Sequence, residues 1–206
     1  MRLHDHLTSG NGYKARLLLA QLGIPYERIE YDIDNRATRT AEFLAKNPNG
    51  RIPVLELDDG SFLPESNAIL WYLAEGTPFL PAERRQRAEV LRWMFFEQNH
   101  HEPNIAGLRF WIMHAVPTTP LMDLWRPAKR AAGEAALAVM EGHLATRPFF
   151  VGDRYGIADI ALYAYTHVAP EGGFDLAPYP HVRAWFARVA AQPGYIPITQ
   201  DKAKAS

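Results

Sequence analysis

The stretch Asn47-Pro48-Asn49-Gly50-Arg51-Ile52-Pro53-Val54-Leu55 carries the strongest indication of architecture in this chain. Pro53 would begin a short apolar strand, where a proline removes no ladder hydrogen bond and where an X-Pro bond is a natural place for a cis peptide. Asp58-Asp59-Gly60 and a second apolar run, Ser61 to Leu63, follow. This pattern predicts a tight β-hairpin. We therefore expect a cis bond between Ile52 and Pro53 at the entrance to the hairpin.

The segments on either side of this hairpin alternate between strand and helix signals. We expect strands over 1–6 and 26–32, a helix over 13–22 that ends at Gly23, a helix capped by Thr38 or Thr40 that ends near Asn47, and a helix that begins at Glu65-Ser66-Asn67 and closes at Gly76. The predicted order is βαβαββα. Residues 1–77 should therefore form an α/β domain.

After Thr77-Pro78 the strand signals stop. Long helical patterns cover 83–101, 121–144, 157–167 and 181–191, and prolines mark the joints between them. We therefore predict that residues 83–206 form a second, all-helical domain.

Composition excludes several classes of function. The 206 residues contain no cysteine, which removes disulfides, thiolate metal sites and cysteine nucleophiles, so any thiol chemistry needs a thiol from outside. Lys and Arg number 22 against 23 acidic residues, a balance that argues against nucleic-acid binding. The apolar runs are too short for a membrane helix, and the N-terminus lacks a signal-peptide pattern, so we expect a cytoplasmic protein. The eight histidines show no metal-ligand spacing, and we expect no metal.

A dinucleotide-binding fingerprint competes with other interpretations of the first helix. Gly10-Asn11-Gly12-Tyr13-Lys14-Ala15 fits the relaxed G-x-G-x-x-A pattern, and Glu30 and Asp32 follow about twenty residues later. A Rossmann domain needs further parallel, strongly apolar strands, whereas a hairpin and then helices follow here. We therefore interpret the glycines as a sharp turn into the helix.

Four features of the sequence resemble those of one family. The βαβαββα order is thioredoxin-like, and the stretch from Asn47 to Leu55 followed by Glu65-Ser66-Asn67-Ala68-Ile69 looks like the glutathione-binding half of the cytosolic glutathione transferases. Gly152-Asp153-Arg154-Tyr155-Gly156-Ile157-Ala158-Asp159-Ile160 is similar to the mark of their helical half, with Gly156 where the family usually has Ser or Thr. The resemblance covers nearly the whole chain.

The resemblance implies a site for glutathione as co-substrate. Pro53 would be cis, the Ile52 backbone would pair with the cysteinyl part of the tripeptide, and Arg51 belongs to the same motif. Glu65 and Ser66 would hold the γ-glutamyl end, because Glu65 can accept from the ammonium group of the ligand and Ser66, at a helix N-terminus, presents its hydroxyl and backbone N–H to a carboxylate. The alternative for Glu65 and Ser66 is a favourable helix start.

The resemblance also implies catalytic residues after the first strand. Ser9 stands at the catalytic position of the serine-type arrangement, and Thr8 and Asn11 could share or assume its role. The alternative for Ser9 is a helix N-cap. Tyr13 lies inside the expected helix and fits the family's catalytic tyrosine poorly.

The function implied is conjugation of glutathione to a small apolar electrophile in a homodimer. Glutathione-dependent reduction of disulfides or peroxides, and a binding module without turnover, are the alternatives. The helices over 65–75 and 83–101 are the expected dimer contacts. Local signals for the electrophile pocket, for which packing in the core is the alternative, are Arg109, Phe110, Trp111, Met113, Tyr163 and His167.

Overall fold

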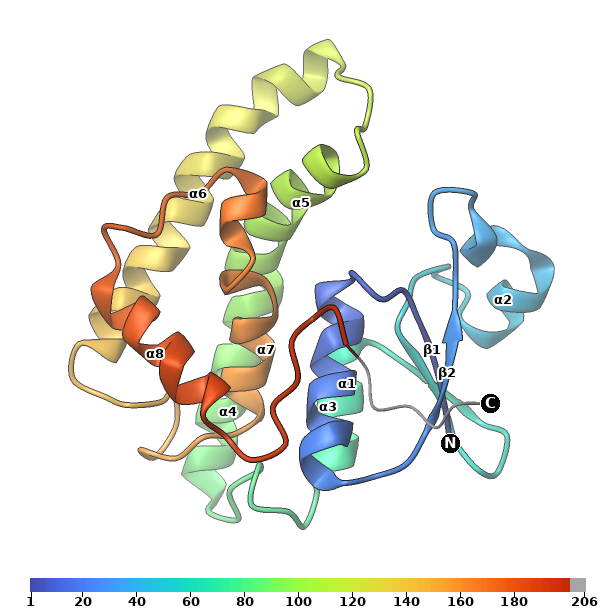
Figure 1. Cartoon of the computed structure of the whole chain (residues 1–206), viewed down its shortest axis with the longest axis horizontal. Coiled ribbons are helices and arrows are strands. Elements are labelled where there is room, and N and C mark those ends of the chain that lie inside the picture. Colours follow the sequence, from blue (N-terminus) through green and yellow to red (C-terminus); the bar gives the residue numbers. More distant parts are fainter. Residues whose placement is uncertain (201–206) are drawn as a thin grey trace. The chain divides into compact units, whose positions relative to one another are not determined.

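The computed structural model describes residues 1–200, which form two compact units (Figure 1). Unit 1 comprises Met1–Thr77 together with the described residues from Gln192 onward, and unit 2 comprises Pro78–Ala191. The predicted βαβαββα order is confirmed for unit 1, and every long element of unit 2 is a helix. No helix in the described part of the chain is long and apolar enough to cross a membrane.

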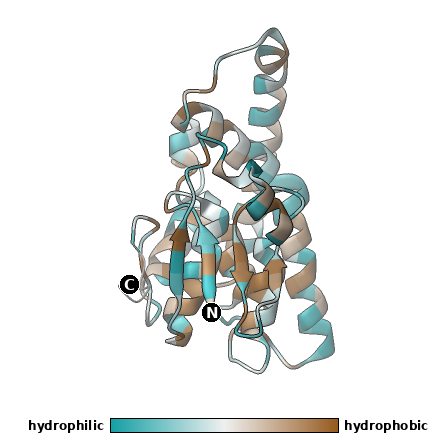
Figure 2. Cartoon of the chain, turned by 90° about the vertical axis from the view of Figure 1, so that its right-hand side faces the viewer, coloured by the Kyte–Doolittle hydropathy of each residue, from teal (hydrophilic) through white to brown (hydrophobic). Residues whose placement is uncertain are grey.

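Unit 1 is built on a mixed four-stranded sheet in the order β2-β1-β3-β4. The strands are β1 (Arg2–Asp5), β2 (Glu27–Glu30), β3 (Val54–Glu56) and β4 (Phe62–Pro64). β1 pairs in parallel with β2 and antiparallel with β3, opposing Leu3 to Arg28 and Leu55. Gly60 has φ 83° in the turn of the β3–β4 hairpin. Figure 2 shows hydrophobic colour along this hairpin and mixed colour elsewhere in the sheet.

The α-helices in the described residues of unit 1 number three, and the first two begin at a side-chain hydroxyl cap. They are α1 (Gly10–Leu22), α2 (Ala41–Lys46) and α3 (Ser66–Ala74), with a short 3₁₀ turn, η1 (Ala37–Arg39), before α2. Ser9 caps α1, which ends at the left-handed Gly23 (φ 66°), and Thr40 caps α2. α1 packs against α3 on one face of the sheet, and α2 lies on the other (Figure 1).

Residues 192–200 belong to unit 1, whereas we predicted them as part of the helical half; residues 201–206 of that prediction lie outside the described residues. Tyr13 Oη donates to the Ile196 carbonyl oxygen at 2.6 Å, and Arg16 Nη1 donates to the Ile198 carbonyl at 3.0 Å. Ile196 and Ile198 are buried. The pairing partners of this segment lie about 180 residues away in α1, so no local pattern indicates them.

Unit 2 contains α4 (Arg84–Phe96), α5 (Glu102–Met113), α6 (Pro120–Leu144), α7 (Ile157–Thr166) and α8 (Pro180–Ala190), with a 3₁₀ turn, η3 (Ala169–Gly172), after α7. The helix expected to end at His101 instead continues through a π-helical stretch, η2 (Glu97–His101), into α5. Pro103 does not stop it, because a proline in the first turn of α5 replaces no hydrogen-bonded N–H of that helix.

The core of unit 2 is aromatic. Trp93 and Trp185 are fully buried, and each meets the ring of Phe150 edge-on at 4.6 Å and 5.2 Å between centroids. Asp159, in the first turn of α7, is also buried and accepts a hydrogen bond from Trp185 Nε1 at 2.9 Å. The start of α7 is therefore fixed to α8 by a buried polar contact.

Candidate active site

The turn between β1 and α1 places Ser9 at the head of the helix. Ser9 Oγ accepts from Gly12 N at 3.2 Å, and Ser9 N donates to the His6 carbonyl oxygen at 2.9 Å. The capping interpretation of Ser9 is thus correct. It leaves the hydroxyl proton available, because the capping bond uses only a lone pair of Oγ. Thr8, Ser9 and Asn11 are half-buried, so a ligand can reach this turn.

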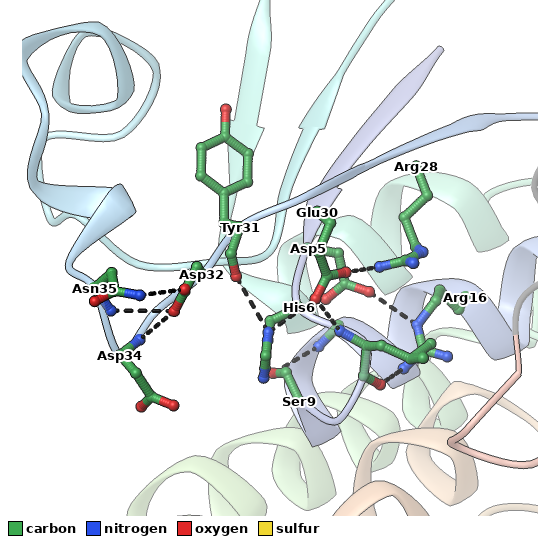
Figure 3. A network of polar contacts seen from close by, with 12 residues as sticks. Asp5, His6, Ser9, Arg16, Arg28, Glu30, Tyr31, Asp32, Asp34 and Asn35 are labelled. Carbon is green, nitrogen blue, oxygen red and sulfur yellow. Dashed lines mark hydrogen bonds and ion pairs between the residues drawn. The ribbon is translucent and has the colours of Figure 1, made fainter. Parts of the chain in front are cut away.

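Glu30 ties the turn to the end of β2 (Figure 3). Its carboxylate accepts from Leu7 N at 3.2 Å and lies 2.9 Å from His6 Nδ1, and Arg28 pairs with its other oxygen. Asp32 accepts from Asp34 N and Asn35 N within its own loop. Both acidic residues of the dinucleotide fingerprint therefore have structural partners in unit 1.

A buried ion pair lies behind the same turn. Arg16 Nε donates to Asp5 Oδ2 at 2.8 Å, and both side chains are fully buried (Figure 3). Burial raises the pKa of the Asp5 carboxyl, while the positive charge of Arg16 lowers it. A Cβ on Gly12 would meet Asp5 Oδ1 at 1.5 Å, so only glycine lets α1 pass this carboxylate. Arg16 also donates to the Leu7 carbonyl and so supports the turn directly.

Asn47 organises the loop that leads to the cis-proline. Its side chain donates to the Arg51 carbonyl oxygen at 2.7 Å and accepts from Asn49 N at 3.1 Å, and Gly50 adopts φ 63°. The Ile52–Pro53 bond is cis, as predicted. Sequence reasoning assigned no role to Asn47; the signal was an amide residue before Pro-Asn-Gly, where side-chain bonds to a turn are common.

The start of α3 carries Glu65 and Ser66. Glu65 has φ 72° and ψ 112°, a sparsely populated conformation for a residue with a side chain, and its carboxylate does not cap the helix. The Glu65 side chain is exposed, and it does not cap the helix start, which was the alternative role for this residue. No acidic residue occupies the first turn of α3, so the N–H groups there are not neutralised by a neighbouring carboxylate.

α1 and α3 meet at a polar contact between two predicted site residues. Ser66 Oγ donates to Asn11 Oδ1 at 3.0 Å, and Lys14 Nζ donates to Ser66 Oγ at 3.3 Å. Lys14 is fully buried. Sequence reasoning missed Lys14, although a lysine within the apolar run of α1 was a visible signal, because a buried lysine needs a specific partner.

The residues suggested for the electrophile pocket lie in unit 2 and divide into two groups. Arg109 pairs with Glu171 at 2.6 Å, and Tyr163 stacks on His167 with centroids 4.4 Å apart. Burial lowers the pKa of His167 to about 4. Phe110 and Met113 are exposed at the end of α5. Arg109, Tyr163 and His167 therefore belong to packed contacts, while the end of α5 presents apolar side chains to solvent.

A pocket of about 120 Å³ in unit 2 is a separate feature. Phe79, Gln86, Arg154 and Tyr155 are among the residues that line it, and none of the residues predicted for catalysis or glutathione binding does. The residues predicted for glutathione all lie in unit 1.

Comparisons with known proteins identify the family of both halves. Residues 1–75 match the glutathione S-transferase N-terminal domain, and residues 126–193 match the glutathione S-transferase C-terminal domain. A crystal structure of a glutathione S-transferase from Pseudomonas fluorescens is 50% identical, with a TM-score of 0.93 over 97% of this chain and 98% of that one.

Two further relatives have informative names. The disulfide-bond oxidoreductase YfcG of Escherichia coli is 33% identical over 89% of this chain and 87% of its own. A glutathione transferase from Burkholderia graminis, solved with two glutathione molecules per subunit, is 27% identical with a TM-score of 0.82, over 99% of this chain and 89% of that one. The thioredoxin-like sheet, the helical second half and these matches agree, and the chain belongs to the glutathione S-transferase family.

Proposed function

We propose that this protein binds glutathione in unit 1 and ionises its thiol for attack on a small apolar electrophile. The observation that carries the proposal is the contact between Asn11 and Ser66, which brings the first turns of α1 and α3 together. Two helix N-termini there offer positive electrostatic potential to a ligand with carboxylates and a thiolate.

Four of the predicted glutathione-binding residues contact the ligand directly in this proposal. Glu65 accepts from the γ-glutamyl ammonium, the first turn of α3 at Ser66 binds the adjoining carboxylate, and the Ile52 backbone pairs with the cysteinyl unit. Arg51, exposed beside Ile52, supplies a cation for a ligand carboxylate. Family resemblance supports these roles together with the helix geometry.

The chemical task is to ionise a thiol with a pKa of about 8.5. Lowering that pKa by about two units requires roughly 2.7 kcal/mol of selective thiolate stabilisation. A hydroxyl donor from Ser9, an amide donor from Asn11 and the N-terminus of α1 supply contributions of this size. The thiol proton leaves to solvent, the sulfur forms a bond to the electrophilic carbon, and the leaving group departs with its electron pair.

Disulfide reduction is the second candidate, and the similarity to a disulfide-bond oxidoreductase favours it. Because this chain has no cysteine, both thiols would come from glutathione. One glutathione thiolate attacks a disulfide sulfur and releases a thiol, and a second attacks the mixed disulfide. Oxidised glutathione and two substrate thiols result.

The assembly we propose is a two-fold homodimer that uses α3 and α4, with the helical unit 2 (Pro78–Ala191) supplying the electrophile pocket. Leu91 and Phe95, one helical turn apart, expose large apolar surfaces on α4. Light scattering should give about twice the 23.3 kDa chain mass at micromolar concentration. A result equal to the mass of one chain would contradict the homodimer.

A single series of assays tests the function. Glutathione should quench or enhance tryptophan fluorescence in a saturable way, and the protein should then be assayed in parallel with an aryl chloride, a hydroperoxide and a small disulfide. Glu65→Gln should weaken glutathione binding about tenfold, the magnitude expected for one charge-assisted hydrogen bond. Saturable binding without turnover in any assay would favour a binding module, and absence of binding would refute the proposal.

A further inference from the structure

Lys14 is the feature that the proposed function does not yet use. It is fully buried in the middle of the first unit's apolar helix α1, and its ammonium group lies 3.3 Å from Ser66 Oγ at the start of α3. Ser66 is itself 6% exposed, and its Oγ lies 3.0 Å from Asn11 Oδ1. Three residues from two helices thus form a continuous chain of hydrogen bonds that ends at the predicted thiol site.

The chemistry of the three side chains fixes which atom donates and which accepts in each hydrogen bond of this series. A lysine ammonium has three donors and no acceptor, so Lys14 must donate to Ser66 Oγ. The single hydroxyl proton of Ser66 is then directed to Asn11 Oδ1, which can only accept. Asn11 thus uses its acceptor atom Oδ1 toward Ser66, and Nδ2 is the donor group of the same carboxamide.

We propose that Lys14 is a positioning residue for thiol activation, acting through Ser66 to orient and polarise the Asn11 carboxamide so that Nδ2–H donates to the glutathione sulfur. This inference rests on the proposed function. The fixed charge of Lys14 strengthens each successive hydrogen bond of the chain, because bonds in series polarise one another in a low-dielectric interior. Lys14 itself does not touch the sulfur.

The chain also assigns a specific role to Ser66. Its hydroxyl proton is engaged with Asn11, so the γ-glutamyl carboxylate is bound by the backbone N–H groups that begin α3 and not by the Ser66 hydroxyl. Ser66→Ala keeps those N–H groups and breaks the link between Lys14 and Asn11. It should therefore change the acidity of the bound thiol more than it changes the affinity for glutathione.

The experiment measures two quantities in the full-length protein: the glutathione Kd from tryptophan fluorescence, and the pKa of the bound thiol from thiolate absorbance against pH. Ser66→Ala and Lys14→Gln should each raise the pKa of the bound thiol by about 0.5 to 1 unit, which is a threefold to tenfold loss of thiolate below that pKa. The Kd should change less than about threefold. Tyr13→Phe, which removes a buried hydrogen bond from the same helix, is the matched control and should leave the thiol pKa unchanged.

A double-mutant cycle separates positioning from a general structural effect. In an Asn11→Ala background, Ser66→Ala should no longer shift the thiol pKa, because the acceptor of its proton is gone. A tenfold loss of affinity in Ser66→Ala with an unchanged thiol pKa would overturn the proposed role of Lys14 and Ser66 in orienting Asn11. It would not contradict the proposal that the wild-type protein binds glutathione. Failure of the wild-type protein to bind glutathione would instead refute the proposed function. If Lys14→Gln does not fold, the thiol pKa of Ser66→Ala alone decides whether the hydrogen bonds from Lys14 through Ser66 to Asn11 affect the thiol.

Discussion

The first turns of α1 in unit 1 and α7 in unit 2 present the same physical problem and solve it differently. Each helix begins among buried groups, and each has a buried aspartate beside its first turn, Asp5 for α1 and Asp159 for α7. The N–H groups at a helix start need acceptors, and the helix dipole favours negative charge there. The two aspartates differ in what they accept from.

Asp159 serves the helix start itself. It accepts from Gly156 N at 3.1 Å, from Phe150 N at 3.2 Å and from Trp185 Nε1 at 2.9 Å. Burial raises the pKa of Asp159 to about 7, and these hydrogen bonds lower it in part. Gly156 has no side chain to act as a cap, so the carboxylate three residues later performs that function.

Asp5 is instead held by the cation of Arg16, and Ser9 caps α1 with a hydroxyl. The charge near this helix start is therefore balanced within the buried pair, and the half-exposed turn at Ser9 and Asn11 keeps its attraction for an external anion. Under the proposed function, this difference separates a helix start that serves folding from one that binds a ligand. The outcome depends on whether the neighbouring carboxylate is engaged by the helix or by a cation.

Removing the cation beside α1 should have the largest effect on the difference between the two helix starts. Arg16→Met leaves Asp5 buried without its charge partner and also removes the bonds to Leu7 and Ile198. Breaking a buried pair in this way destabilises a protein by about 3 to 5 kcal/mol. Urea denaturation followed by circular dichroism should show a loss of that size.

The matched control changes both members of the pair. Asp5→Asn combined with Arg16→Met removes the unpaired charge, and the double variant should recover at least about 1 kcal/mol relative to Arg16→Met alone. Equal stability of the double and single variants would mean that the carbonyl contacts of Arg16, and not its charge, hold α1 in place.

The dependence of stability on pH should come next in size, and it involves both ends of α7. His167 has a pKa lowered to about 4, so its folded form binds fewer protons than its unfolded form, and it contributes stability that is lost as pH falls from 6.5 to 4. Asp159 has a pKa raised from 3.8 to about 7, so its contribution has the opposite sign and declines as pH rises through that window. The two slopes should nearly cancel between pH 4 and 6.5 in the wild-type protein.

A single variant removes one of the two titrating groups, so the pH dependence of stability that comes from the other group should become measurable. Asp159→Asn should become more stable as pH rises from 4 to 6.5, and His167→Gln should become less stable, each by about 3 kcal/mol over the window. Urea denaturation at four or five pH values measures both. Parallel curves for the two variants would show that neither group titrates in this range in the folded protein.

A smaller effect separates the two buried tryptophans of unit 2. Trp185 Nε1 donates to Asp159, whereas Trp93 Nε1 has no hydrogen-bond partner among residues 1–200. Trp185→Phe and Trp93→Phe remove the same volume beside Phe150, but only the first takes a hydrogen bond from a buried carboxyl group. We expect Trp185→Phe to cost about 1 to 3 kcal/mol more than Trp93→Phe in urea denaturation. Equal losses would mean that packing alone holds α7 to α8.

The sequence was most informative where the determinants were local. Turn residues predicted the β3–β4 hairpin, and X-Pro chemistry at Ile52 and Pro53 predicted the cis bond. The continuation of α4 into α5 was missed, because we predicted a helix over 83–101 and no helix across the residues that form α5.

The residues that support the candidate site, Arg16 and Lys14, were not predicted from the sequence, for a different reason. Arg16 acts on Asp5 and on a carbonyl 182 residues away, and Lys14 acts across two helices on Ser66. Such contacts depend on tertiary packing, which a single sequence taken by itself does not specify. A charged residue within an apolar helix was the signal that the sequence offered, because a buried charge requires a partner and the local sequence has none.

The smallest change in stability should separate the two roles of Ser9, which caps α1 and is proposed to donate to the glutathione sulfur. Ser9→Ala loses both and should cost about 1 kcal/mol of stability, whereas Ser9→Gly keeps a tolerated N-cap and should cost only a few tenths. Both remove the hydroxyl, so both should slow conjugation by the same tenfold to hundredfold, the loss expected for one charge-assisted hydrogen bond of about 1.5 to 3 kcal/mol. If activity follows stability instead, so that Ser9→Gly is nearly as active as the wild type, the hydroxyl serves only the helix. Asn11 would then be the one side-chain donor to the sulfur in this proposal, without Ser9, and the first turn of α1 would resemble that of α7 in using its capping residue for folding alone.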